Sequence, residues 1–131
     1  MKPQTETELA PLLLDPSGPA VVAIGGGHGQ ASALEAIQTY AGSISALVSV
    51  ADNGGSSGRL TPFGTPPPGD IRRCLLALTP DPSLWSELFA HRFDEGDISD
   101  HSLGNLILVA LTDLFGDFAS AVDRVVKCFE F

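Results

Sequence analysis

A glycine-rich run at residues 25–29, Gly-Gly-Gly-His-Gly, is the first part of this sequence that could do chemistry. An apolar stretch precedes it and a pattern of helical period follows it, so the run is expected between a strand and a helix. Backbone N–H groups can approach an anion there because side chains are absent, and the start of the helix adds about half a positive charge. We therefore predict a phosphate-binding turn rather than a plain connection, formed by Gly26, Gly27, His28 and Gly29.

The spacing of this run separates it from the dinucleotide fingerprint. Ser32 stands where the fingerprint would place its third small residue, a glycine or alanine, so NAD is not indicated. Two interpretations of His28 stay open, contact of its imidazole with phosphate and exposure to water.

A second polar segment begins at Asp52, at the carboxyl end of the next predicted strand. An acidic side chain in that place commonly meets a ribose hydroxyl or a metal bound to phosphate, and a turn cap is the alternative. The residues after it supply hydroxyls, N–H groups and one guanidinium, which together can enclose a diphosphate. A flexible linker is disfavoured because of that guanidinium and the strand before it. The candidate ligand residues are Asn53, Gly54, Gly55, Ser56, Ser57 and Arg59.

Asp70 is predicted to cap the N-terminus of a helix and to belong to the site. The first turn of that helix carries Arg72 and Arg73, whose positive charges oppose the helix dipole unless an anion lies near them. For Arg73, a ligand contact and a solvated surface charge are equally open.

The triplet Asp100, His101 and Ser102 does not form a catalytic triad, because adjacent side chains point in different directions. Ser102 is predicted to cap a helix instead. His101 and Asn105 are candidates to present polar groups to a ligand from the start of that helix, and no residue is assigned a catalytic role.

The elements that must position these residues follow from periodicity. Strands are predicted at 21–24 and 44–50, with a helix at 29–41 between them, which makes the strands parallel and buries the first on both faces. Two later helices are predicted to begin at Asp70 and at Asp81, and both are expected to cover the sheet. A further helix is predicted to follow Ser102, and a last one includes residues 118–129.

These elements predict an α/β fold, a Rossmann-like three-layer arrangement with a parallel sheet flanked by helices. Residues 1–19 are expected to be a loosely ordered leader, and residues 20–131 a single nucleotide-phosphate-binding domain. The sheet has few strands for so many helices, so the domain is expected to be incomplete.

Composition and charge exclude several classes of binding partner. The formal net charge of −9 argues against nucleic acid and anionic membranes. The longest apolar run, residues 106–111, is too short to span a bilayer, and Cys74 and Cys128 lack the spacing of a zinc site or a disulfide framework. A cytoplasmic protein that binds a small anionic ligand is expected, and its oligomeric state, a homo-oligomer included, stays open.

Four motifs together resemble one family, the gluconeogenesis factor (YvcK-like) and 2-phospho-L-lactate transferase (CofD-like) family. They are the glycine run at 25–29, Val-Ala-Asp-Asn-Gly-Gly-Ser-Ser-Gly-Arg-Leu at 50–60, Pro-Pro-Gly-Asp-Ile-Arg at 67–72 and His-Ser-Leu-Gly-Asn-Leu at 101–106. They occur in the family's order and correspond to its N-terminal part. The second motif looks more like the gluconeogenesis factor branch.

The resemblance implies a ligand across the carboxyl ends of the strands. In the gluconeogenesis factor branch that ligand is UDP-N-acetylglucosamine, and the protein influences carbon metabolism, envelope synthesis and cell shape. The other branch transfers a phospholactyl group from a guanosine diphosphate conjugate to a deazaflavin with magnesium; here Asp52 and Asp70 would hold the metal and His101 would aid the acceptor. A regulatory binding protein is favoured over this enzyme.

Two features depart from the family. Asn53 stands where the family usually has a second aspartate, which removes a carboxylate that magnesium or a sugar would use. Family members are also more than twice as long, so a fragment is expected, and a third interpretation is a truncated domain with an exposed apolar face.

Overall fold

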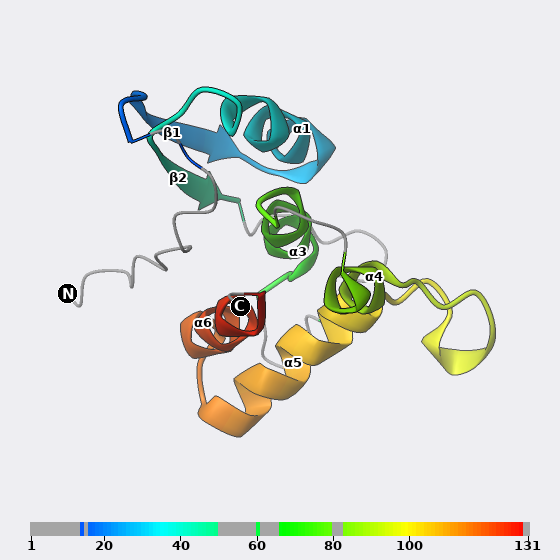
Figure 1. The fold of residues 1–131 in the computed structure, drawn as a ribbon. Helices are drawn as coiled ribbons and strands as arrows, with labels where there is room; N and C mark the ends of the chain where they lie inside the picture. The colour runs from blue at the N-terminus through cyan, green and yellow to red at the C-terminus, as the bar shows by residue number, and fades with distance from the viewer. Residues whose placement is uncertain (1–13, 15, 50–59, 61–65, 80–82, 130–131) are drawn as a thin grey trace.

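The computed structural model describes residues 14, 16–49, 60, 66–79 and 83–129, so most of the predicted leader lies outside the described residues. Figure 1 shows a small sheet and α1 at one end of the molecule, a group of helices at the other, and α3 between them. The α/β, Rossmann-like class is confirmed for a partial domain. In chain order the elements are β1 (Ala20–Gly25), α1 (Gly27–Ile37), β2 (Ser43–Val48), α3 (Gly69–Ala77), α4 (Leu84–Ala90), the 3-10 helix η2 (Gly96–Ile98), α5 (Leu103–Phe115) and α6 (Phe118–Phe129).

The two strands form a parallel pair, as predicted for a strand–helix–strand unit. Their register runs from Ala20 opposite Ser43 to Gly25 opposite Val48. Helix α1 is shorter than the predicted 29–41: it begins at Gly27 and ends at Ile37. The last positions of the predicted helix form a turn instead, and that turn still buries Ala41 completely.

One face of the sheet is exposed, so the prediction that β1 is buried on both faces is wrong for the described residues. Burial alternates along both strands, and the inward side chains of Ala23, Ile44 and Ala46 pack on α1 and α3. The outward ones stay open to solvent: the exposed fraction is 60% for Val22, 79% for Ile24 and 52% for Leu47. The continuous apolar run predicted burial correctly only for alternate residues.

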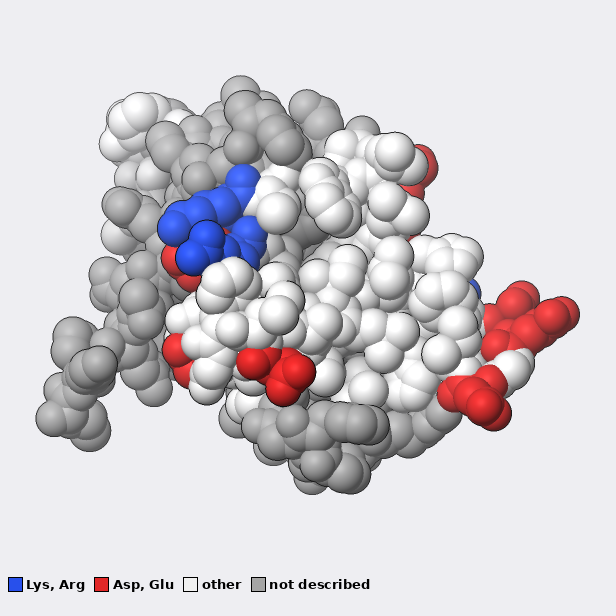
Figure 2. Space-filling view, turned by 90° about the horizontal axis from the view of Figure 1, so that it is seen from below, with Lys and Arg blue, Asp and Glu red and all other residues white. Residues whose placement is uncertain are grey.

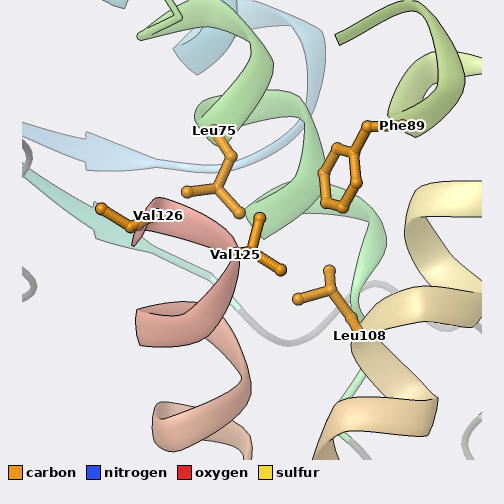
Figure 3. Packing of buried hydrophobic residues seen from close by; sticks show 5 residues of the cluster. All are labelled: Leu75, Phe89, Leu108, Val125 and Val126. Atoms are coloured by element: carbon orange, nitrogen blue, oxygen red, sulfur yellow. The ribbon is translucent and has the colours of Figure 1, made fainter. Parts of the chain in front are cut away.

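Helix α3 belongs to two apolar clusters. Its residues Cys74, Ala77 and Leu78 pack with Leu34 of α1 beneath the sheet. Leu75, from the other side of the same helix, enters a second cluster with Phe89 of α4, Leu108 of α5 and Val125 and Val126 of α6, shown in Figure 3. The helix therefore joins the sheet to the helical part of the molecule.

Helix α4 differs from its prediction in both its start and its packing. Ser83 caps it, with reciprocal hydrogen bonds between Ser83 and Ser86, whereas the expected start at Asp81 lies outside the described residues. Only Phe89 of its apolar residues is fully buried, and Trp85 is exposed. The helix packs beside α5 and α3, away from the sheet that it was expected to cover (Figure 1).

Most of the basic surface on the face drawn in Figure 2 gathers in one compact place. Acidic atoms lie directly beside this basic group, and further acidic side chains lie elsewhere on the same face. Among the described residues, no helix combines the length and apolar character needed to cross a bilayer.

Candidate functional site

The glycine run forms the turn between β1 and α1. Gly26 is the N-cap of α1, with an extended backbone and no side-chain cap, and Gly27 has a φ of 67° that a residue with a side chain would adopt only with strain. The first N–H groups of a helix lack partners within the helix, and among the described residues no side-chain cap is present at this N-terminus. The turn thus has the geometry of an anion-binding helix start.

An open depression of about 440 Å³ lies beside this turn, at the carboxyl ends of both strands. Its lining residues are Ile24, Gly25, Ala46, Leu47, Val48 and Ser49. Ligands of open parallel sheets bind at this end of the strands, so the depression is the natural place for the rest of a molecule whose phosphate reaches the turn.

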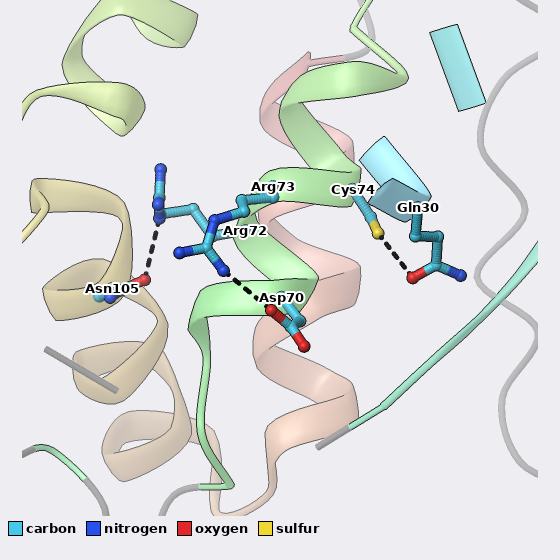
Figure 4. A network of polar contacts seen from close by, with 6 residues as sticks. All are labelled: Gln30, Asp70, Arg72, Arg73, Cys74 and Asn105. Carbon is cyan, nitrogen blue, oxygen red and sulfur yellow. Dashed lines mark hydrogen bonds and ion pairs between the residues drawn. The ribbon is translucent and has the colours of Figure 1, made fainter. Parts of the chain in front are cut away.

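Asp70 lies against the glycine turn, although it is not the helix cap that the sequence predicted. The N-cap of α3 is Pro68, and Asp70 lies within the first turn of the helix. Its carboxylate is buried, with Oδ2 2.5 Å from the position that a Cβ atom on Gly26 would take. Arg73 binds the other oxygen, with 2.8 Å between Nη1 and Oδ1 (Figure 4). Arg73 is therefore an ion-pair partner of Asp70 and not an isolated surface charge.

Arg72 and Asn105 meet between α3 and α5. The Arg72 Nε atom donates a hydrogen bond of 3.1 Å to Asn105 Oδ1, between the first turns of α3 and α5. Burial, together with the charges of Arg73 and Arg92, lowers the pKa of Arg72 to about 10. Ser102 caps α5 as predicted, since its hydroxyl accepts the Asn105 N–H. His101 is buried beside it.

Gln30 connects both strands to α3, a role that sequence analysis did not predict. Its amide donates hydrogen bonds of 3.0 Å to the carbonyl oxygens of both Ala23 in β1 and Leu47 in β2. The Cys74 thiol of α3 donates in turn to Gln30 Oε1 at 3.3 Å (Figure 4). Burial, with a smaller contribution from Asp70, raises the pKa of Cys74 to about 11. A glutamine directly after the predicted phosphate-binding turn was the only available signal.

The structure brings together Gly26, Gly27, Asp70 and Arg73. It places Asn105 against Arg72 instead, and His101 is buried at the residue before the α5 cap. His28 and Gly29 lie exposed in the first turn of α1. The predicted ligand residues Asp52, Asn53, Gly54, Gly55, Ser56, Ser57 and Arg59 lie outside the described residues. Within the described ranges, no three side chains of histidine, cysteine, aspartate or glutamate come together as metal ligands.

Comparison with known proteins assigns the family. The sequence profile of the family described as 2-phospho-L-lactate transferase CofD matches residues 21–131. The chain belongs to the CofD family. The resemblance in its four motifs is therefore confirmed.

Relatives of this CofD-family chain are named gluconeogenesis factor. The one from Bacillus subtilis is 48% identical over 111 residues, which are 83% of this chain and 35% of the relative. The one from Halalkalibacterium halodurans is 48% identical over 109 residues, 82% of this chain and 34% of the relative. The chain thus spans about a third of the length of these curated relatives.

A solved structure shares the fold of this CofD-family chain. The crystal structure of a Bacillus halodurans protein superposes with a TM-score of 0.78 at 46% identity, covering 86% of this chain and 36% of that protein. The strand–helix–strand unit and the helices described above thus belong to a fold found by experiment.

Proposed function

We propose that this chain is the phosphate-binding part of a gluconeogenesis factor, which binds a nucleotide-sugar and takes UDP-N-acetylglucosamine as its ligand. The observation that carries the proposal is the turn at Gly26 and Gly27, where uncapped N–H groups of α1 meet the open ends of both strands. The names of the relatives support the gluconeogenesis factor branch.

Binding, rather than catalysis, is the activity proposed for this part of the protein. The turn consists mainly of backbone groups, and the carboxylate of Asp70, which lies against it, is already paired with Arg73. Such a site can hold a diphosphate by hydrogen bonds without moving a proton. The whole protein would act in the cytoplasm as a sensor that regulates carbon metabolism, envelope synthesis and cell shape.

The alternative function is transfer of a phospholactyl group from a nucleoside diphosphate conjugate to a deazaflavin, which the description of the family supports. Magnesium would then neutralise phosphate charge. Of the two aspartates expected to hold it, Asp70 is described and bound by Arg73, while Asp52 lies outside the described residues.

Titration calorimetry of this chain with UDP-N-acetylglucosamine, UDP and GDP, each with and without magnesium, tests the proposal. We expect saturable binding of the UDP-sugar and of UDP, with GDP weaker. Preference for GDP, binding that requires magnesium, and formation of product with a deazaflavin would instead support the transferase. Binding of none of the three nucleotides would contradict both functions for this part of the protein.

A further inference from the structure

The charged side chain of Arg72 is buried and closely packed. Only 6% of the residue is exposed. Its stem packs against Gly104 in the first turn of α5, where a Cβ atom would stand 2.9 Å from Arg72 Cδ and would also overlap the Phe89 carbonyl oxygen. Gly104 thus makes room for Arg72 between α3, α4 and α5.

Most of the hydrogen-bonding capacity of this guanidinium is unused. The group has five N–H donors, of which Nε binds Asn105. In the described part of the chain, neither terminal nitrogen of Arg72 has an acceptor within hydrogen-bonding distance. Figure 4 shows the guanidinium extending from its bonded Nε atom away from Asn105 and from Asp70. A buried charge with unpaired donors is costly unless a ligand satisfies it.

Further positive charges lie around the Arg72 guanidinium. Arg73 and Arg92 both lie close enough to disfavour its charged form. The N-terminus of α5, at Ser102 and Asn105, points into the same region and adds its partial positive charge. The side chain of Arg92 binds a backbone carbonyl, that of Asp100, which leaves its charge uncompensated by that contact.

We propose that the terminal N–H groups of Arg72 bind an oxyanion, a phosphate or a carboxylate, in a second subsite between α3 and α5. This subsite is distinct from the glycine turn, because the Asp70 carboxylate lies against Gly26 whereas the Arg72 side chain lies against Gly104 and Asn105 of α5. It takes either a free anion or the acidic group at the end of a larger molecule. The inference does not depend on which nucleotide binds the turn.

Nuclear magnetic resonance of the ¹⁵N-labelled chain separates the two sites. Titration with inorganic phosphate should shift the Arg72 Nε–H signal along a saturable curve, while the Gly27 amide reports the turn. A parallel titration with acetate distinguishes carboxylate from phosphate. Shifts confined to Gly27 would overturn the inference and leave the proposed function intact. An Arg72 signal that moves no earlier than that of the exposed Arg124 would overturn it too.

Two variants test whether the guanidinium itself binds. Arg72→Met keeps the stem but loses the donors, and phosphate affinity reported by backbone amides at the start of α5 should fall at least about tenfold, because charge-assisted hydrogen bonds are lost. Arg72→Lys should restore part of it. The matched control Arg124→Met removes an arginine that stacks on Phe115, far along α6, and should change nothing. Equal affinity in Arg72→Met and the original chain would overturn the inference, and the Nε–H titration decides even if that variant fails to fold.

Discussion

The carboxylate of Asp70 occupies the space that a side chain on Gly26 would need, with Oδ2 2.5 Å from the position of that Cβ atom. Gly26 itself has a φ of −167°, which any residue can adopt, so close neighbours restrict the position to glycine: Asp70, and also Ser49, whose Cβ atom lies 3.2 Å from the same position. Two motifs about forty residues apart in sequence are therefore fitted to each other.

Gly26→Ala should push Asp70 away, disturb its ion pair with Arg73 and weaken nucleoside diphosphate binding at least about tenfold, the effect of losing one charge-assisted hydrogen bond. Calorimetric titration with UDP measures it. Gly29→Ala is the matched control, since it keeps the backbone N–H that the turn would use and no atom lies within 4 Å of its Cβ position. That variant should bind normally and gain about 0.5–1 kcal/mol of stability. Equal affinity of both variants would show that Asp70 does not shape the turn.

Gln30→Met should lower the free energy of unfolding by about 1–3 kcal/mol, because the carbonyl groups of Ala23 and Leu47 lose their shared donor. Urea denaturation measures the change. Gln38→Met provides the control on the same helix: its amide also binds two carbonyls, but in a partly exposed place where water can replace it. A larger loss for Gln38→Met than for Gln30→Met would contradict the role given to Gln30.

The two thiols should differ in reactivity and in their effect on stability. Cys128 is exposed and should react with a thiol reagent in the folded chain, whereas buried Cys74 should react only after unfolding. The pKa of Cys74 rises from 9.0 to about 11 on folding, so its contribution to stability is full below pH 9 and is lost as pH rises toward 11.

Arg72 should raise the free energy of unfolding as pH increases above about 10, which is opposite to the effect of Cys74. The reason is that loss of the Arg72 proton removes a buried charge from the folded chain. The fall in the free energy of unfolding that is due to Cys74 should hence be clearest between pH 9 and 10. Urea denaturation across this range should show the fall in the original chain and a flatter profile in Cys74→Ala; identical profiles would refute the assignment to this thiol.

Ile24→Thr should leave the free energy of unfolding within about 0.5 kcal/mol, since this side chain is 79% exposed on the open face of the sheet. It should also reduce binding of a hydrophobic dye, because it removes apolar surface. Leu34→Ala, in the part of α1 that packs against the buried side of the same sheet, should lower the free energy of unfolding by about 2–5 kcal/mol. Comparable losses in the two variants would mean that the open face is covered in solution.

Local patterns predicted the elements better than their surroundings. The change from an apolar run to helical spacing located β1, α1 and β2, and Ser102 was recognised as a cap because its hydroxyl acts within its own turn. Asp70 was misassigned as a cap because the prolines before it start the helix earlier; its carboxylate pairs with Arg73 on the same helix and lies against Gly26, which is distant in sequence. The roles of Gln30 and Arg72 depend on which elements become neighbours, which spacing along the chain does not show.

Helix α3 contributes Cys74 and Leu78 to the cluster under the sheet and Leu75 to the cluster among the helices. This one short helix therefore belongs to both hydrophobic clusters, and neither cluster can lose its contacts with α3 without exposing residues of the other. The sheet end and the helical end should consequently unfold together in one cooperative transition, although they look like two small bodies side by side.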